Sequence, residues 1–540
     1  MTLPISRRNL LKLSAAASAT SLLGCSTQAK HDGWEKGQLQ HILPLASHNS
    51  FNIKVSFTKP QLNGVQLTLN GNSHTAIQED SAGRFFSFVI TNLNPATHYQ
   101  LQLLNSKDDP LCASWPLKTL PALDADVKKL TLAAFTCAGG PDWPVFWEKH
   151  AFKPVTYRKA LFDILLKDKP DVVIANGDHI YWDFHSWVDN REGWFAKMAS
   201  QKIIDMKGRF DETLPVIGSV NEQTLTNIAD EQLASIYGVA FRSTPVLFVT
   251  DDHDYFDNDD STPDKTTFPP NKFHQDLRDT LQRFYFPEFI VQSENEKTLP
   301  GVFEKQGALL SKQYGRLRFG KLLDTLLYDC GGHISLDGNN ARLVPKRVED
   351  WLLTQTHNED THHLIHVPSH PMGWTAGKWR EWYPDLLESS GSMLAQVGSE
   401  DSDEKYNWQQ GWWHQHQRLC QSMSQQKKRK AVCVSGDLHV LGSGKIQKSG
   451  DLDLSANPVV SILSGPVGVG DLGWLSRARG LTAQHPKGVM VDNLLAPLER
   501  NGYTLLTFTP ENIQVQQFQC PTGLPEPQML TVEEVARFTI

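Results

Sequence analysis

Hydrophobic and polar residues alternate with a period of two in several short runs between residues 50 and 118. The apolar positions of these runs are Ile53, Val55 and Phe57, then Val65, Leu67 and Leu69, then Phe86, Phe88 and Ile90, then Tyr99, Leu101 and Leu103. Gly, Asn or Pro interrupts the chain between runs, which is typical of an antiparallel β-sandwich. No titratable cluster is expected in this block, so the pattern indicates a structural module.

The pattern changes near residue 130 to short, mostly apolar strands that alternate with helical stretches. The expected strands cover residues 130–136, 171–175, 246–250, 364–367, 431–435 and 458–463. Residues 157–167 carry apolar positions at helical spacing, and residues 121–129 have the composition of a linker. This alternation predicts a layered α/β domain after a β-sandwich domain.

The first thirty residues have the pattern of an export signal. Residues 6–12 resemble the twin-arginine motif, with Arg7 and Arg8, and an apolar stretch continues to Leu23. That stretch is too short to span a membrane as an ordinary helix. It ends in Gly24-Cys25, which resembles a lipoprotein cleavage box, so Cys25 is either an acylated N-terminus or an incidental residue. We expect export by the twin-arginine route, to the periplasm or to an outer-membrane or cell-surface anchor.

The composition narrows the possible functions. The 540 residues include 52 basic and 60 acidic side chains, a net charge of −8, which disfavours a sequence-specific nucleic-acid binder. Seven cysteines are too few for a disulfide scaffold, whereas 20 histidines invite a metal site. No charge run or repeat indicates a protein partner.

Five of the expected strands are followed directly by residues of the types that bind metals in proteins. Polar residues come after them at Thr136-Cys137, Gly177-Asp178-His179-Ile180-Tyr181, Asp251-Asp252-His253-Asp254, Ser369-His370 and Gly436-Asp437-Leu438-His439. A single Asp after a strand is usually a turn former or a helix cap. Five such ends in one domain favour converging loops, because ligands of open α/β sheets bind at the carboxyl ends of the strands. Carboxylate, imidazole and thiol groups together are what a two-metal hydrolytic centre requires.

In this order, the motifs GDxxY, DDHD and GDxH resemble the metallophosphoesterase superfamily and, more narrowly, the alkaline phosphatase D (PhoD-like) family. The resemblance covers about residues 40–520. It implies an α/β fold with α-β-β-α layers over residues 128–525 and a fibronectin III-like β-sandwich over residues 40–122, with residues 1–30 as the signal. The sequence Leu93-Asn94-Pro95-Ala96-Thr97-His98-Tyr99 resembles the fibronectin III corner.

The resemblance also implies a role for each matching residue. Asp178 would bridge two metals and take part in catalysis. Cys137, Tyr181 and His439 would bind one metal, Fe3+ in the family. Asp252 and Asp437 would bind the second, a Ca2+-type site whose oxygen ligands suit a hard cation. His253 would contact the phosphoryl group and protonate the leaving oxygen.

Three features depart from the family pattern. His370, in Ser369-His370-Pro371, is an additional candidate ligand that would shift the second site toward a transition metal. An expected phosphate-side Arg is missing, because the chain has Asp329-Cys330-Gly331 there. The acidic run at residues 257–260 is either a source of calcium ligands or a solvated loop.

Six tryptophans crowd residues 374–413, and they indicate either a substrate-facing or lipid-facing lid or a satellite core. They are Trp374, Trp379, Trp382, Trp408, Trp412 and Trp413.

The sequence therefore predicts an exported hydrolase of small-molecule phosphoesters, with a phosphodiesterase or alkaline phosphatase D-like activity and a metal-bound hydroxide as nucleophile. A phosphomonoesterase or phospholipase-type enzyme is one alternative. A non-catalytic, metal-stabilised surface lipoprotein is another, although such a protein would not need His253.

Overall fold

The computed structural model describes residues 33–142, 150–182, 185, 194–257, 261, 265–376, 408–478, 480–523 and 527–540. The predicted export signal, residues 258–260 of the acidic run, and Trp379 and Trp382 lie outside the described residues. Residues 36–540 form one compact unit, and the division into domains at residues 40–122 and 128–525 stays a prediction. No helix in the described ranges is long and apolar enough to cross a membrane.

The N-terminal block forms two four-stranded antiparallel sheets. One has the order β1 (Leu39–Ala46), β2 (Phe51–Phe57), β6 (Phe85–Ile90), β5 (Ile77–Gln78), and the other β4 (Asn72–Thr75), β3 (Val65–Leu69), β7 (His98–Asn105), β8 (Trp115–Lys118). Phe51 meets Tyr99 edge-on at 5.8 Å between ring centroids, which joins the two sheets. The Tyr99 hydroxyl accepts a hydrogen bond of 2.8 Å from the Asn94 backbone N–H, the contact expected of the tyrosine corner.

The expectation that no titratable residues cluster in this block is wrong. Strand β2 is buried on both faces, and the Lys54 ammonium lies 3.0 Å from a Glu288 carboxylate oxygen. Glu79 pairs with Arg283 at 2.7 Å and also with Lys305. These partners lie more than 200 residues away, in and after the helix that covers the sheet, so the alternation of β2 does not reveal them.

Two larger sheets form the α/β region. The six-stranded sheet has the order β11 (Val246–Val249), β10 (Val172–Asn176), β9 (Leu130–Phe135), β23 (Gly502–Phe508), β24 (Ile513–Gln519), β25 (Glu533–Thr539). The eight-stranded sheet has the order β15 (Tyr314–Phe319), β16 (Leu323–Tyr328), β17 (His363–Pro368), β18 (Val432–Ser435), β21 (Val459–Ser464), β19 (Leu441–Ser449), β20 (Leu452–Asp453), with β22 (Val489–Leu498) on β19. The strands expected from the apolar runs are confirmed within one or two residues.

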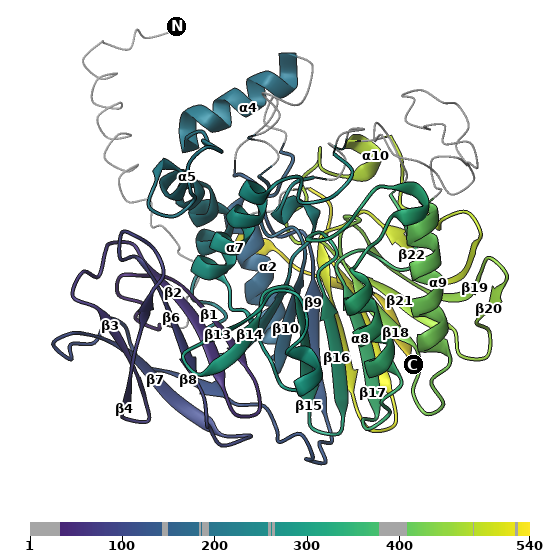
Figure 1. Cartoon of the computed structure of the whole chain (residues 1–540), viewed down its shortest axis with the longest axis horizontal. Coiled ribbons are helices and arrows are strands. Elements are labelled where there is room, and N and C mark those ends of the chain that lie inside the picture. Colours follow the sequence, from purple (N-terminus) through teal and green to yellow (C-terminus); the bar gives the residue numbers. More distant parts are fainter. Residues whose placement is uncertain are drawn as a thin grey trace, which may run out of the picture. The chain divides into compact units, whose positions relative to one another are not determined.

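Helices cover the two sheets separately (Figure 1). Helices α2 (Val155–Lys167), α5 (Val220–Ala229) and α7 (Lys272–Tyr285) share one hydrophobic core with β9, β10 and β11. Helices α8 (Lys346–Thr356) and α9 (Gln410–Ser424) share another with β16 and β18. The sheets touch each other where Thr504 Oγ1 donates to the Ser464 carbonyl at 3.0 Å.

Shorter elements complete the described fold. A three-stranded sheet has the order β12 (Phe289–Ile290), β14 (Ala308–Ser311), β13 (Val302–Lys305). The remaining helices include α4 (Trp194–Lys207), α6 (Ser235–Tyr237) and α10 (Leu475–Ala478), and a π-helical turn, η1 (Asp230–Ala234), joins α5 to α6.

Candidate metal centre

The carboxyl ends of parallel strands from both large sheets meet and carry the predicted ligands. Strands β9, β10 and β11 are parallel, as are β16, β17, β18 and β21. Three groups have ligand atoms within 4.8 Å of one another: Cys137, Asp178 and His439; Asp178, Asp252 and His253; Asp251, Asp252 and Asp437. Because the groups share Asp178 and Asp252, they form one continuous cluster.

The first group surrounds one carboxylate oxygen of Asp178. The Cys137 thiol lies 3.3 Å from Asp178 Oδ2, and the Tyr181 hydroxyl donates to the same oxygen at 3.1 Å. His439 Nε2 is 3.9 Å from it and 3.3 Å from the Tyr181 hydroxyl. The other His439 nitrogen, Nδ1, lies 2.8 Å from the Gly473 carbonyl, which turns Nε2 toward Asp178.

The second and third groups come from the loop after β11 and from Asp437. Asp252 joins Asp178 and His253 in one group and Asp251 and Asp437 in the other. Asp251 is missing from the predicted ligands, because the family resemblance implies only Asp252 of this adjacent pair. The signal that would have included it is its position two residues after β11, the same offset as Cys137, Asp178 and Asp437 have from their strands.

His370 lies at the edge of the cluster. Its Nδ1 is 3.9 Å from Asp437 Oδ2, but His370 falls in none of the three groups found among the described residues. Its ring meets that of Trp412 edge-on at 5.1 Å. The structure therefore brings His370 beside the second and third groups without completing a ligand set around it.

Four predicted ligands have left-handed backbone conformations. The φ angles are 49° at Cys137, 57° at Asp178, 69° at Asp437 and 53° at His439. This region is uncommon for residues other than glycine, and such positions cluster at functional sites, where the surrounding structure holds them. Cys137 is the most unusual, since Asp and His visit this region more readily.

The cluster is rich in carboxylates that are costly to ionise without a cation. Burial and then the neighbouring Asp252 raise the pKa of Asp437 to about 8, and burial raises the pKa values of Asp178 and Asp251 well above the usual range. Burial lowers the pKa of His439 to about 4, so its imidazole is neutral and able to bind a metal.

The residues fit a pair of metal ions. Asp178 Oδ1, Asp251 Oδ2 and His370 Nε2 are buried and lack a hydrogen-bond partner among the described residues. Buried polar atoms are normally paired, so the unpaired oxygens of Asp178 and Asp251, which belong to the groups of candidate ligands, are suited to bind cations. The thiol, phenol, imidazole and carboxylate donors are all metal ligands.

Thr136 and Asn176 connect the ligand loops of the two sheets. The Thr136 hydroxyl donates to the Asn176 carbonyl at 2.6 Å and accepts from the Asp437 N–H at 3.2 Å. The Asn176 amide donates to the Pro368 carbonyl at 3.0 Å. A Cβ atom on Gly436 would lie 2.3 Å from the Asn176 carbonyl oxygen, which explains the glycine before Asp437.

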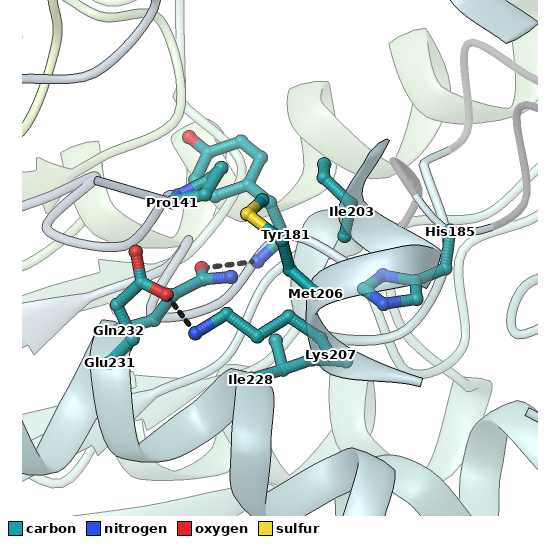
Figure 2. Close-up of a pocket in the computed structure, with 9 residues that line it drawn as sticks. All are labelled: Pro141, Tyr181, His185, Ile203, Met206, Lys207, Ile228, Glu231 and Gln232. Carbon is teal, nitrogen blue, oxygen red and sulfur yellow. Dashed lines mark hydrogen bonds and ion pairs between the residues drawn. The ribbon is translucent and has the colours of Figure 1, made fainter. Parts of the chain in front are cut away.

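Gln232, on the π-helical turn η1, joins the Cys137 loop to the Tyr181 loop. Its Oε1 accepts hydrogen bonds from the Gly140 N–H at 2.7 Å and from the Tyr181 N–H at 3.0 Å. The second bond is drawn in Figure 2, where Gln232 lies beside Tyr181 in the wall of a small pocket under α4. The preceding residue, Glu231, pairs with Lys207 of α4 (Figure 2).

The absence of the expected phosphate-side Arg, whose position is occupied by Gly331, has a steric explanation. A Cβ atom on Gly331 would lie 2.4 Å from the Asp251 carbonyl carbon and 2.6 Å from the Asp252 nitrogen. No side chain fits at that position while the loop after β11 keeps its place. Asp329 instead faces a buried network, where it accepts from the Tyr255 hydroxyl at 2.6 Å and from Thr250 at 2.7 Å.

The described tryptophans of the 374–413 stretch belong to the core. Trp374, Trp408, Trp412 and Trp413 are between 0% and 8% exposed, and all but Trp374 share the core under α8 and α9. For these four the structure favours the satellite core over the lid. Of the acidic run, Asp257 is described and buried.

A model of the family described as PhoD-like phosphatase matches residues 135–517, which begin just before Cys137 and include every residue of the cluster. No curated protein matches the chain by sequence.

Among solved structures, one titled "Structure of PhoD" is 14% identical over 93% of this chain and 90% of its own, with a TM-score of 0.59. At that identity the likeness shows a shared fold. The purple acid phosphatase PPD1 from yellow lupin (Lupinus luteus) seeds is 12% identical over 92% of this chain and 73% of its own, with a TM-score of 0.48.

Proposed function

This chain belongs to the PhoD-like phosphatase family, and we propose that it works as an exported phosphodiesterase with two metal ions. A metal-dependent phosphoesterase activity on small-molecule phosphoesters is expected from the family, so the enzyme prediction is confirmed and the non-catalytic alternative is not supported. The observation that carries the two-metal part of the proposal is the position of Asp178 in two candidate ligand groups at once.

We assign the ligands to two sets that share Asp178. Cys137, Tyr181 and His439 would hold Fe3+. Asp252 and Asp437 would hold Ca2+, and we add Asp251 to this set because it shares a group with both. His370 remains the alternative ligand that would favour a transition metal at the second site.

When bound, two cations would lower the pKa of a water nucleophile and offset the negative charge on the phosphoryl oxygens. The protein's own groups orient the reaction. Asp178 belongs to both ligand sets and so links them. The Gly473 carbonyl fixes the orientation of His439. His253 protonates the leaving oxygen; its ring packs on Tyr181 at 4.3 Å between centroids, which limits its movement.

The test is hydrolysis of bis-p-nitrophenyl phosphate beside p-nitrophenyl phosphate, by protein purified folded after export, with and without added Ca2+. We expect the diester to be the better substrate and Asp437→Asn to abolish the rate. A faster monoester would replace the proposal with the phosphomonoesterase alternative. No hydrolysis of either, in protein shown to hold both metals, would refute both and leave a specialised substrate such as a phospholipid head group.

Export and anchoring are a separate part of the proposal, supported by the sequence of residues 1–30. Replacing Arg7 and Arg8 by Lys should leave the protein in the cytoplasm, and Cys25→Ala should abolish labelling by a fatty acid. Export of the double-Lys variant, or labelling of the Cys25 variant, would contradict it.

We also propose the finer description of the fold, with a fibronectin III-like sandwich over residues 40–122 and α-β-β-α layers over residues 128–525. The hydrogen bond from Asn94 to Tyr99 supports the first, and separate helical cores on the two large sheets support the second. Limited proteolysis tests the boundary. We expect the first cuts outside the signal to fall in residues 121–129, and early cuts within residues 40–120 would contradict it.

A further inference from the structure

Asp254, the last residue of the DDHD motif, is fully buried, and its carboxylate accepts hydrogen bonds from four backbone N–H groups. It ends a short 3-10 turn, η2 (Asp252–Asp254), and is 0% exposed. Its Oδ1 accepts from the N–H groups of His179 at 2.9 Å and Ile180 at 3.1 Å. Its Oδ2 accepts from the N–H groups of Asp178 at 3.1 Å and Asp251 at 2.9 Å.

These four bonds add to the pairing of β10 with β11 and tie together the loops that follow the two strands. The first three come from consecutive residues after β10, whose N–H groups form a concave nest of the kind that binds anions. The fourth comes from the loop after β11. One carboxylate thus fixes Asp178, with its φ of 57°, against the loop that carries Asp251 and Asp252.

We propose that Asp254 is a positioning residue, which sets the separation between Asp178 and the Asp251–Asp252 pair and so tunes the affinity of the cluster for cations. Asp254 would affect catalysis only indirectly, through the metal ligands that it holds in place. This inference rests on the proposed function in one respect, that the cluster binds metal.

The substitution Asp254→Asn isolates this role because Asn has nearly the same shape. An amide keeps one acceptor oxygen and replaces the other with an NH2 donor. In either orientation of the amide, two backbone N–H groups then face a donor, and at least one of them belongs to residues 178–180. The geometry of the Asp178 loop is therefore lost whichever way the new amide turns.

Asp80 offers a matched control far along the chain. It is also buried, and its carboxylate accepts from the N–H groups of Gly83, Arg84 and Phe85 at 2.9–3.1 Å. These bonds close a turn before β6, in the N-terminal block. All three N–H groups reach Asp80 Oδ1, so an Asn whose amide oxygen takes that place should keep these bonds, lose only the second one from Arg84, and leave the cluster intact.

The first measurement is hydrogen–deuterium exchange of the metal-free protein. In the wild type, the amides of residues 178–180 and 251 should be protected before any metal is added. They should exchange faster in Asp254→Asn, whereas Asp80→Asn should leave the exchange of residues 178–180 and 251 as in the wild type. Free exchange of residues 178–180 in the metal-free wild type would overturn the proposal even if Asp254→Asn failed to fold.

The second measurement is the affinity for Mn2+, titrated into metal-free protein against a competing chelator. We expect Asp254→Asn to weaken binding about 10- to 100-fold, the usual cost of removing a group that supports metal ligands. Asp80→Asn should stay within about twofold of the wild type. An unchanged affinity in Asp254→Asn would refute the positioning role. Neither measurement uses a phosphoester, so failure here is distinct from a wild type that hydrolyses no substrate.

Discussion

The hydroxyl of Thr136 should contribute substantially to the free energy of unfolding, because it is buried and makes two hydrogen bonds. The substitution Thr136→Val tests this. The side chain is 1% exposed, and Val keeps its shape. The substitution removes the donor to the Asn176 carbonyl and the acceptor of the Asp437 N–H. A buried polar group left without a partner costs about 1–3 kcal/mol, so two such groups predict a loss of about 2–4 kcal/mol after the added methyl contact is counted.

The control is Thr325→Val, in strand β16. Thr325 is also fully buried, but its hydroxyl has no hydrogen-bond partner among the described residues. Replacing it with a methyl group should leave stability unchanged or raise it slightly, because a buried hydroxyl without a partner is itself unfavourable.

Urea denaturation of the metal-free proteins, followed by tryptophan fluorescence, gives both values without the contribution of bound cations. Equal losses in the two variants, or a loss below about 0.5 kcal/mol in Thr136→Val, would refute the reasoning, since the hydrogen bonds alone distinguish the two sites.

Three further predictions concern the cluster directly. Asp178→Asn and His439→Ala should each lose most of the bound metal and nearly all activity; elemental analysis beside the diester assay checks this, and a metal-replete, active Asp178→Asn enzyme would contradict it. Because the pKa of Asp437 is about 8 in the fold against 3.8 as its ordinary value, the metal-free fold retains a proton that the unfolded chain releases. The contribution of Asp437 to stability should be full below about pH 4 and fall as the pH rises to 8, and bound metal should remove this contribution in melting curves at pH 5 and 8. Gly436→Ala should reduce metal content and activity at least about tenfold, because its Cβ meets the backbone of β10 at 2.3 Å, whereas Gly442→Ala, with its nearest contact at 3.4 Å, should be tolerated in the same assays.

The strands and the location of the cluster could be predicted because their causes are local. A run such as residues 172–175 is apolar throughout and stops at Asn176-Gly177-Asp178, so both the strand and its functional end are visible in a few residues. Tyr181 and His439 can be identified from short spacings within their motifs. The assignment of each to a particular metal came from family resemblance and stays a proposal.

The features that could not be predicted depend on contacts between distant segments. Lys54 and Glu288 are 234 residues apart, and the sequence around either residue does not indicate that the two form an ion pair. The same applies to Asp254, which looks like one more acidic residue of a motif until its four backbone partners are seen. That Asp251 and Asp252 both belong to the cluster likewise depends on the turn η2, whose shape the strand pattern does not specify.

The π-helical turn η1 makes this region sensitive to chain length. Asp230 contacts Arg84 and Tyr285, Glu231 contacts the Asp142 N–H, and Gln232 holds Gly140 and Tyr181. A π turn accommodates one more residue than the α-helix around it. Deleting one residue from 230–234 would restore regular helix and rotate the preceding helix by about 100° relative to the helix after the turn, so these three residues could no longer all meet their partners. A substitution here removes a single contact, whereas a one-residue deletion would break several of these contacts at once. Natural variation should therefore conserve the length of this segment more strictly than its composition.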